Sequence, residues 1–436
     1  MNRRVWAHPR KTQVIELAQP PTAIRSEIPT LRNNFVWTFA GSVLYTGCQW
    51  GMLSAIAKLG STSLVGQFTL GLAVAAPVFM FTNLQLRAVQ ATDVNAECGF
   101  ADYFSLRLLA TLGGLIAIAA LLPFVVSSPT VRLVILLVAL SKCIECMSDV
   151  TAGLLQREER LKRVAISQII RGIGSVLVFS LTLAYSRDLA LAVVAMSAVW
   201  FAVLLFYDVP NVKALIGRHE RFFRFDRRAL WRLAMLGLPL GWVATFASLN
   251  VNIPRYFLEH YRGLADQGIY ASLAYLVVGV SLIVYALTQS VTTRLAYLFA
   301  SGNLKQFARM LTKLSMLGVL IAIVGVPLTF AVGRPLLTLL YRREYGDHVG
   351  LMALLVGIAG ISTIGAFLFC GLTAARAFRA QVPVYLAAVL VVTVGSALLV
   401  PRYGLMGAGT AVLLSTVTIV LGGIWMMRKI VRSQLG

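Results

Sequence analysis

Long runs of apolar residues recur along the whole chain, and they restrict the fold more than any other feature. One example is LLATLGGLIAIAALLPFVV at 108–126. A run of 18 or more apolar residues is long enough to cross the hydrocarbon core of a bilayer as a helix. Only helices and closed barrels satisfy their backbone hydrogen bonds in lipid, and barrel strands would alternate polar and apolar positions. The runs show no such alternation, so the sequence predicts an all-α polytopic membrane protein.

Twelve such spans can be assigned, which predicts about 12 transmembrane helices in two six-helix lobes around a central cavity. The composition agrees, because only 13% of the 436 residues are charged, against about 25% in a soluble domain. The mean hydropathy is +0.80. The predicted spans are 33–53, 62–86, 106–127, 131–155, 164–184, 188–207, 231–257, 267–290, 310–331, 347–374, 381–400 and 404–427.

The basic residues are distributed unevenly about these spans. If both termini lie inside, the inner segments hold 28 of the 39 Lys and Arg residues and the outer loops hold 9, with Lys142 and Arg171 inside spans. This is the asymmetry of the positive-inside rule, and it predicts cytoplasmic termini. Topology and attraction to anionic lipid also account for much of the net charge of +22, so a nucleic-acid partner is not needed.

The longest hydrophilic stretch between spans, 208–230, divides the chain into two units of six spans. GQFTLGLAVAAPVF at 66–79 and GIYASLAYLVVGVS at 268–281 occupy equivalent places in the two units. With an even number of spans each, the units would be parallel repeats that rock around a central cavity; two polytopic halves can also look alike without a repeat. The predicted organisation is a basic cytoplasmic tail (1–30), an N-terminal lobe (31–207), a cytoplasmic linker (208–230), a C-terminal lobe (231–427) and a second cytoplasmic tail (428–436).

Three charges interrupt the fourth span in SKCIECMSDV, residues 141–150. At 100° per residue, Lys142, Glu145 and Asp149 share one stripe of that helix. Arg171 lies at a similar depth in the fifth span. Charges inside a membrane normally pair and face the protein interior or water. A mixed cluster of the four is therefore expected, either as a brace between the two spans or as a wall of the transport cavity, with Asp149 and Glu145 as candidates for ion coupling.

Arg87 and Arg294 close the second and eighth spans at the inner side, with Asn83 and Gln289 beside them. Arginine is suited to bidentate binding of phosphate, so these residues could capture an anionic headgroup at an inner entrance. Arginines at inner ends also anchor topology without binding anything.

Arg255 lies near the outer end of the seventh span, where the positive-inside rule disfavours arginine. Asn250 and Asn252 are on the same segment. The position suggests either a part of the binding site or an ion pair with Glu259.

The sequence offers little for catalysis, metal or cofactor chemistry. All four His residues fall in predicted loops or tails, and the chain has no HExxH, GxSxG, Walker A or DxD motif. Cys143 and Cys146 form a CxxC inside one helix, without a second pair, and are interpreted as small apolar residues. No cofactor, metal site or enzymatic activity is predicted. A membrane enzyme is the less favoured alternative, since the outer loops are short.

Four segments resemble the oligosaccharide flippases of the bacterial, Wzx-like polysaccharide transporters. That group belongs to the superfamily of multidrug and toxin extruders and lipid II flippases. The order and spacing of the segments carry the resemblance, which covers most of the chain after residue 30. The segments are VGQFTLGLAVAAPVFMFTNLQLRAVQATD (65–93), SDVTAGLLQREERLKRVAISQIIRG (148–172), NIPRYFLEHYRGLADQGIYASLAY (252–275) and LLYRREYGDH (339–348).

The resemblance implies a transporter of the bacterial inner membrane that exports a polyprenyl-pyrophosphate-linked oligosaccharide by alternating access. Its partners would be the lipid-linked glycan, membrane lipid and other polysaccharide-assembly proteins. A cation-coupled multidrug extruder of the same fold is the alternative, although residues 35–55 lack the acidic residue expected of many extruders. The 12 predicted spans also differ from the 14 of lipid II flippases. The family fixes no catalytic or binding set by motif, so no residue roles are transferred.

Overall fold

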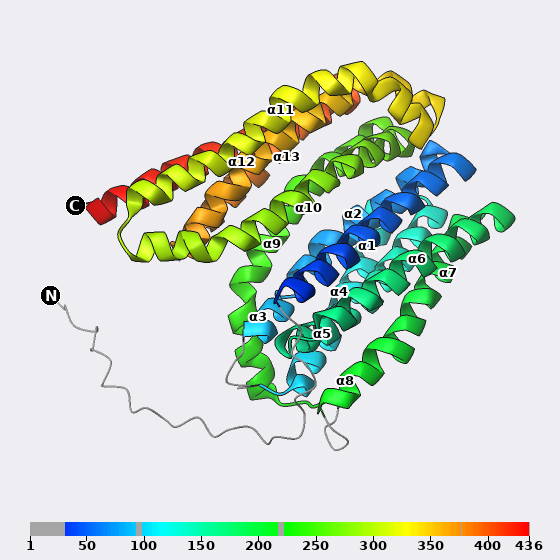
Figure 1. Ribbon diagram of the computed structural model, residues 1–436. Coiled ribbons are helices and arrows are strands. Elements are labelled where there is room, and N and C mark those ends of the chain that lie inside the picture. Colours follow the sequence, from blue (N-terminus) through cyan, green and yellow to red (C-terminus); the bar gives the residue numbers. More distant parts are fainter. Residues whose placement is uncertain (1–30, 93–97, 217–221, 376, 436) are drawn as a thin grey trace.

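The computed structural model describes residues 31–92, 98–216, 222–375 and 377–435, and every element in these ranges is a helix. The predicted all-α fold is therefore confirmed. In chain order, with the labels of Figure 1, the elements are α1 (Leu31–Leu59), α2 (Thr62–Thr82), α3 (Leu86–Thr92), α4 (Phe100–Val125), α5 (Pro129–Arg157), α6 (Leu161–Ser186), α7 (Leu189–Val203), a π-helical turn η1 (Leu204–Asp208), α8 (Val209–Ile216), α9 (Arg227–Arg262), α10 (Leu264–Ala300), α11 (Leu304–Leu340), a 3₁₀ turn η2 (Arg343–His348), α12 (Val349–Ala374) and α13 (Phe378–Leu435).

Short polar residues explain where several helices begin. Ser61, Asp188, Asp226 and Asn303 precede α2, α7, α9 and α11, and each side chain accepts a hydrogen bond from a backbone N–H of the first turn. These N–H groups have no partner within the helix, so the caps satisfy them. The φ of Gly404 is 54°, in the left-handed region, and this residue breaks α13 into two consecutive helical segments.

The described residues contain eight helices long and apolar enough to cross a membrane, or nine if the bent α9 counts as one span. The difference from the predicted twelve has a clear origin. Neither α1 nor α5 is among the nine, and α13 counts once although Gly404 divides it. For α5 the physical reason is the charge that Lys142, Glu145 and Asp149 bring into its centre. Each predicted span corresponds to a helix or half of α13, whereas the number that crosses the membrane stays a prediction.

The helices pack into two bundles with the same order of partners (Figure 1). In the first, α1 packs on α6, while α2 and α4 pack on α5. In the second, α9 packs on α13, while α10 and α11 pack on α12. This correspondence is what parallel repeats would produce. It supports the proposed two lobes, called here the N-lobe (α1–α8) and the C-lobe (α9–α13); their exact bounds stay a prediction.

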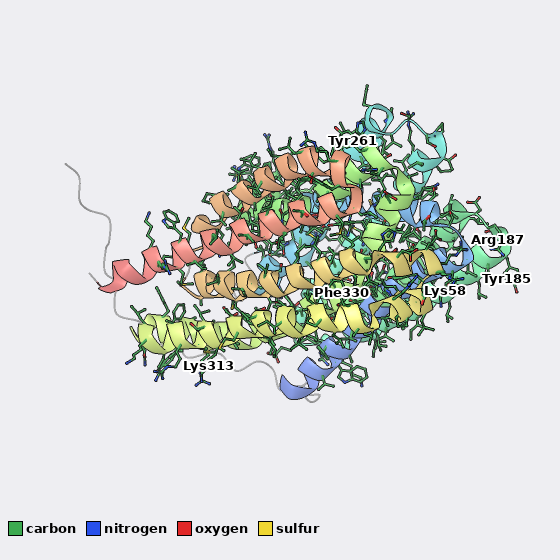
Figure 2. All side chains as sticks on the ribbon, turned by 90° about the horizontal axis from the view of Figure 1, so that it is seen from above. Lys58, Tyr185, Arg187, Tyr261, Lys313 and Phe330 are labelled. Carbon is green, nitrogen blue, oxygen red and sulfur yellow. The ribbon has the colours of Figure 1, made fainter. Side chains whose placement is uncertain are left out.

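Large apolar side chains cover the sides of the molecule. Phe330 on α11 is 62% exposed, and similar exposed residues occur on almost every long helix. In Figure 2, Phe330 lies between Lys313 near one end and Lys58 and Arg187 near the other. An apolar belt between charged ends is the surface expected for contact with lipid. The end with Lys58 and Arg187 is called the outer end, and the opposite one the inner end, as the charge asymmetry predicts.

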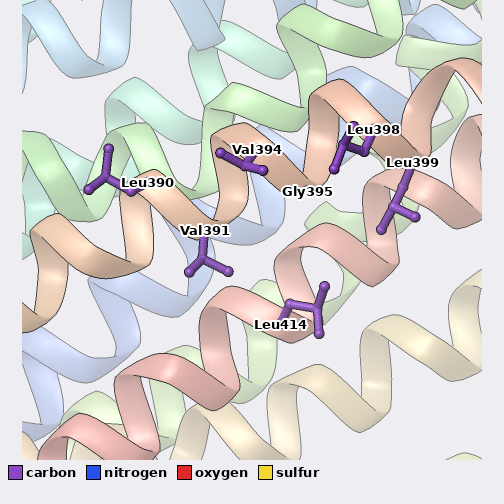
Figure 3. A pocket seen from close by; sticks show the side chains of 7 residues that line it. All are labelled: Leu390, Val391, Val394, Gly395, Leu398, Leu399 and Leu414. Carbon is purple, nitrogen blue, oxygen red and sulfur yellow. The ribbon is translucent and has the colours of Figure 1, made fainter.

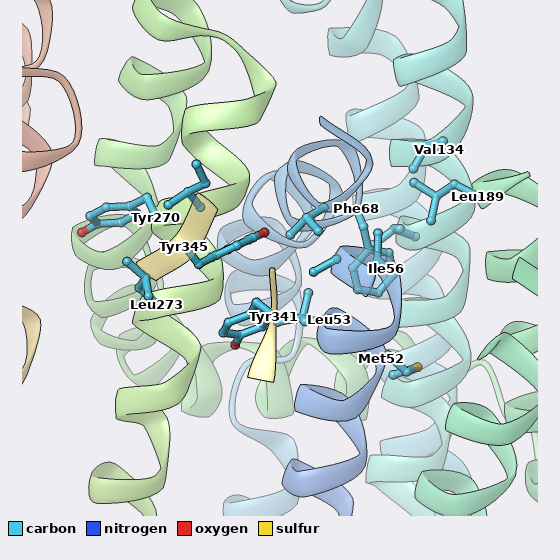
Figure 4. Packing of buried hydrophobic residues seen from close by; sticks show 14 of the residues in the cluster. Met52, Leu53, Ile56, Phe68, Val134, Leu189, Tyr270, Leu273, Tyr341 and Tyr345 are labelled. Atoms are coloured by element: carbon cyan, nitrogen blue, oxygen red, sulfur yellow. The ribbon is translucent and has the colours of Figure 1, made fainter. Parts of the chain in front are cut away.

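The largest core cluster joins the two lobes instead of lying within one. It includes Met52, Leu53 and Phe68 of the N-lobe together with Tyr341 and Tyr345, which flank the start of η2 in the C-lobe. Tyr341 and Tyr345 are stacked with ring centroids 4.8 Å apart. Figure 4 shows these two tyrosines between α10 and the first two helices of the N-lobe. The lobes are thus packed against each other close to the outer end.

Two glycines bring α2 and α10 into backbone contact at that end. A Cβ on Gly66 would collide with the backbone oxygen of Leu264, and a Cβ on Gly268 would collide with that of Thr62. These glycines open the two segments that the sequence places in equivalent positions of the repeat. Only residues without a side chain permit such an approach. This contact, with the hydrogen bonds described next, is called the outer seal.

Five hydrogen bonds cross between the lobes beside the glycines. Two of them join side chains: the Thr69 hydroxyl donates to Gln267 Oε1 at 3.1 Å, and Trp50 Nε1 donates to the Tyr341 hydroxyl at 2.9 Å. The other three end on backbone oxygens: Ser54 Oγ to Leu340 O at 2.5 Å, Tyr256 Oη to Ala73 O at 2.5 Å, and Arg342 Nη2 to Lys58 O at 3.0 Å. The protein is therefore in a conformation that is closed at the outer end.

The predicted linker, 208–230, is packed against the N-lobe where it is described. Phe222 makes edge-on ring contacts with Phe100 and Phe104 of α4, each with centroids 5.5 Å apart. The first part of α9 also belongs to the N-lobe core, through Leu233. Beyond it α9 bends by 48° and continues into the C-lobe. The bent helix α9 is therefore part of the connection between the lobes.

Candidate functional site

The charges of α5 that the sequence singled out form a small network in the N-lobe. Lys142 Nζ lies 2.6 Å from Glu145 Oε2, one turn further along the helix. The Tyr45 hydroxyl of α1 donates to the other oxygen of Glu145 at 2.8 Å. Both charged side chains keep 27% of their surface exposed. This pair is therefore held by its neighbours and still open to a small ligand or water.

Arg171 of α6 completes this network, as predicted. Its guanidinium lies over the Tyr45 ring, 5.7 Å from the centroid, and it attracts the Glu145 carboxylate electrostatically. Arg171 is buried, and so is Asp208 of η1, the second carboxylate close to it. Lys142 Nζ in turn lies 5.8 Å from the centroid of Trp200. Two cations, two carboxylates and two aromatic rings thus share one interior site, called here the N-lobe charge cluster.

The expectation that Asp149 belongs to this cluster is wrong. Asp149 Oδ1 pairs with Arg87 Nη1 at 3.2 Å, and Oδ2 pairs with Arg107 Nη2 at 3.0 Å. Arg87 Nε also donates to Gln156 Oε1 at 3.0 Å. The carboxylate therefore joins α3, α4 and α5 and does not join α5 to α6. The reason is position along the helix: Asp149 shares the stripe of Lys142, but it lies seven residues, or about 10 Å, further along α5, beside Arg87 of α3 and Arg107 of α4.

Arg107 is the member of this second group that sequence reasoning missed. Its position at the start of the third span made it look like one more inner-side basic residue. In the structure its side chain is fully buried, and Nε and Nη1 have no hydrogen-bond partner among the described residues. Asp149 is the carboxylate that neutralises it. No motif in the sequence could have paired these two residues.

Arg87 does not lie at the end of α2 as predicted, because the chain turns sharply first. Leu84 and Gln85 have φ values of 48° and 50°, which is unfavourable for residues with a Cβ. Gly237 of α9 packs against the Leu84 backbone at this corner. The turn starts the short helix α3, which carries Arg87 towards Asp149. Asn83 caps α2 through its backbone N–H, and its side-chain oxygen is buried without a partner among the described residues.

Arg255 of α9 is a partly buried cation of the C-lobe. Its Nη1 donates to Asn252 Oδ1 at 3.3 Å, so the alternative pairing with Glu259 is not formed. Tyr270 and Tyr275 lie within electrostatic range of the guanidinium. Tyr275 also interacts with Glu145 of the N-lobe. It therefore lies within electrostatic range of both Arg255 and Glu145.

Arg294, the predicted entrance arginine of α10, is not part of this arrangement. Arg294 is exposed on α10. Gln289 is on the same helix, but its side chain lies outside what the structure describes. Among the described side chains, the site that the structure assembles comprises Lys142, Glu145 and Arg171 with Tyr45, and Arg294 is not one of them.

Neither metal ligands nor the apolar groove provides a rival polar site. Among the described residues no group of three or more His, Cys, Asp or Glu could hold a metal ion, and Cys143 and Cys146 are free thiols. A groove of about 440 Å³ lies between the two segments of α13. Figure 3 shows its lining, which consists of Leu390, Val391, Val394, Gly395, Leu398, Leu399 and Leu414. With no charged or polar side chain, this groove cannot recognise a phosphate or a sugar.

Two solved transporter structures have the same fold. The lipid II flippase MurJ in an inward closed conformation aligns with a TM-score of 0.73, covering 92% of this chain and 90% of that one at 10% identity. An inward-facing multidrug resistance transporter of the MATE family, in the MOP superfamily, aligns with a TM-score of 0.66, covering 91% and 94% at 12% identity. The fold is therefore that of a multi-pass membrane transporter of the MOP type.

The sequence comparisons narrow this class. The polysaccharide biosynthesis protein family matches residues 31–293, more than half of the chain, and the protein belongs to that family. The capsular polysaccharide biosynthesis protein CapF of Staphylococcus aureus is 28% identical over 389 residues, which cover 88% of this chain and 95% of CapF. The resemblance to polysaccharide transporters that the four sequence segments indicated is confirmed.

Proposed function

We propose that this protein is a flippase for a polyprenyl-pyrophosphate-linked oligosaccharide, a precursor of surface polysaccharide or lipopolysaccharide. The observation that carries the proposal is that a member of the polysaccharide biosynthesis family has the fold of MOP transporters. The relative CapF is named for capsular polysaccharide, and MurJ is named for a lipid-linked substrate. A chain with both likenesses is best explained as a transporter of a lipid-linked glycan and not as an enzyme.

The N-lobe charge cluster is the proposed site for the pyrophosphate. Lys142 and Arg171 supply two cations, and Arg255 supplies a third from the C-lobe. Arginine can bind two phosphate oxygens at once, and lysine adds a point charge. In this structure Glu145 forms an ion pair with Lys142, and 27% of each side chain is exposed. An entering pyrophosphate would compete with this carboxylate for the same cations.

That competition makes Glu145 the stronger candidate for ion coupling. Once the substrate binds Lys142 and Arg171, the Glu145 carboxylate loses its counter-charges inside the membrane. Uptake of a proton or sodium ion would then neutralise it. Asp149 fits this role less well, because Arg107 and Arg87 hold it away from the cluster.

Alternating access would follow from separation of the outer seal. With Gly66 and Gly268 in contact the site is closed to the outer end. Rocking of the N-lobe against the C-lobe would part these helices and open the site outwards. Both termini would be cytoplasmic and the membrane would be the bacterial inner membrane. Lipid, and other polysaccharide-assembly proteins, would be its neighbours there.

A multidrug extruder of the same fold is the second candidate, and the MATE structure is the observation that favours it. Residues 35–55 of this chain contain no acidic residue that could couple drug export to a cation. Broad drug sensitivity in a deletion strain with intact surface polysaccharide would favour the extruder.

The proposed flippase can be tested by complementation of a strain that lacks this gene. We expect K142Q and R171Q to reduce surface polysaccharide at least tenfold while membrane abundance stays normal. K313Q is the matched control, since Lys313 is an exposed cation on α11 of the C-lobe, a helix that contributes no residue to the cluster. Normal polysaccharide in both cluster variants would show that Lys142 and Arg171 are not part of the binding site. Normal polysaccharide in the uncomplemented deletion strain would contradict the proposed function itself.

A further inference from the structure

The segment Phe222–Arg232 presents an unusual surface at the inner end of α9. Phe223, Phe225 and Trp231 are exposed by 46%, 69% and 68%. Arg224, Arg227 and Arg228 are exposed between them. These six residues are called the basic–aromatic collar.

Contacts with α4 hold the collar in place. Phe222 inserts between Phe100 and Phe104, and the backbone N–H of Arg224 donates to Ser105 Oγ at 2.9 Å. Because these contacts fix the backbone, the exposed side chains of the collar form an ordered surface. The exposed rings are not simply the hydrophobic residues of an unpacked loop.

The depth of the collar matches the headgroup region of a bilayer. Trp231 begins an exposed apolar face of α9 that continues through Met235 and Leu236. Tryptophan at the edge of such a face is typical of the membrane interface. Arg227 and Arg228 precede Trp231 by about one turn, or about 5 Å towards water. With Trp231 at the membrane interface, their guanidinium groups would lie at the level of lipid phosphates.

The charge of the collar is also incompletely balanced. Asp226 is the only acidic residue between Phe222 and Arg232. Its carboxylate accepts hydrogen bonds from the backbone N–H groups of Arg228 and Ala229, and it makes one long contact of 3.5 Å with Arg224. The collar thus has a net positive charge that faces outwards.

We propose that the collar is a binding surface for anionic phospholipid. The arginines would bind headgroup phosphates while Phe223, Phe225 and Trp231 insert among the upper parts of the acyl chains. The positive-inside rule explains basic residues at an inner end, but it does not require exposed aromatic rings among them. Because the collar leads directly into the bent helix that joins the lobes, lipid bound there would fix the N-lobe end of the connection. This inference does not depend on the identity of the transported substrate.

Fluorescence quenching by brominated lipid tests the collar directly. The full-length protein is reconstituted in mixtures of phosphatidylcholine and phosphatidylglycerol with one or the other brominated. Quenching at Trp231 is the difference between the protein and its W231F variant. We expect phosphatidylglycerol to be preferred several-fold at Trp231, with a preference that weakens in high salt. Each arginine removed should lower the preference by up to about fivefold.

The variant R224Q/R227Q/R228Q should lose the preference, and R227Q alone should reduce it. K305Q/R309Q/K313Q is the matched control, because it removes three exposed cations from the first turns of α11, residues 304–313, which contain no exposed aromatic residue. It should keep the preference at Trp231. Equal quenching by both lipids in the unmodified protein, or equal loss in the two triple variants, would overturn the proposal. An acidic protein partner would become the better explanation in the first case.

Discussion

Replacing Asp149 with asparagine should destabilise the protein through Arg107. The Arg107 side chain is fully buried, and its bond to Asp149 is 3.0 Å long. The variant D149N leaves this guanidinium inside the N-lobe without a carboxylate. Breaking a buried ion pair by removing one partner costs about 3–5 kcal/mol. Asp149 is itself 31% exposed, so we expect about 3 kcal/mol, the lower end of that range.

The second ion pair of Asp149, with Arg87, provides a comparison within the same molecule. Arg87 is 31% exposed, and exposed ion pairs contribute about 0–1 kcal/mol. R87A should therefore cost less than about 1 kcal/mol. R107M, which removes the buried charge and keeps an apolar side chain, should make D149N almost neutral. The double variant D149N/R107M should then be more stable than D149N by about 2 kcal/mol or more.

Equilibrium unfolding of the purified protein in detergent, with the four variants in parallel, measures these differences. The reasoning is refuted if D149N unfolds with the free energy of the unmodified protein, or if D149N/R107M is no more stable than D149N. Transport by the double variant answers a separate question. Recovery of transport together with stability would make Asp149 a brace between α3, α4 and α5, whereas recovery of stability alone would give it a direct role in transport.

Three further variants test other parts of the account. G268L places a side chain where the Thr62 oxygen lies, so the outer seal should stay open. A cysteine introduced at Ser272 should then react faster with an impermeant maleimide, and unchanged reactivity would argue against the seal. Q267L removes the bond to Thr69 at 3.1 Å and should weaken the closed state by about 1 kcal/mol, measured as a shift between the open and closed populations of spin labels on the two lobes. Hydrogen bonds from backbone N–H groups in the first turn of α9 hold the pKa of the Asp226 carboxyl below its usual value. The stabilising effect of Asp226 is therefore present above the unfolded pKa of about 4 and is lost as the pH falls through the lower folded pKa. D226A should lower the melting temperature at pH 7 and make no difference at strongly acidic pH.

The helices could be predicted well because their signal is local. Apolar runs mark each membrane-length helix, and the equivalent segments at 66–79 and 268–281 pointed to the repeat. Even so, the sequence did not reveal that Gly66 and Gly268 meet across the two lobes. Equivalent positions can lie together or far apart, depending on how the lobes are placed. Periodicity carries no information about that placement.

The charged site was predicted in part, for a similar reason. Helix geometry correctly put Lys142 and Glu145 together, since their pairing depends on one helix alone. Depth alone then grouped Asp149 with Arg171, although the two side chains face different helices. Arg107 was missed because its burial depends on how α4 packs against α5. Partners within a helix follow from spacing, whereas partners between helices require the fold.

Reconstituted flipping tests the central proposal most directly. Purified protein is placed in vesicles whose inner leaflet holds a lipid-linked oligosaccharide with a fluorescent tag, and appearance of the tag outside is followed with a membrane-impermeant quencher. We predict transfer well above that of empty vesicles, loss of transfer in K142Q/R171Q, and transfer close to normal in K313Q. The account would be contradicted if the glycan were transferred no faster than in empty vesicles while the same preparations exported a cationic drug.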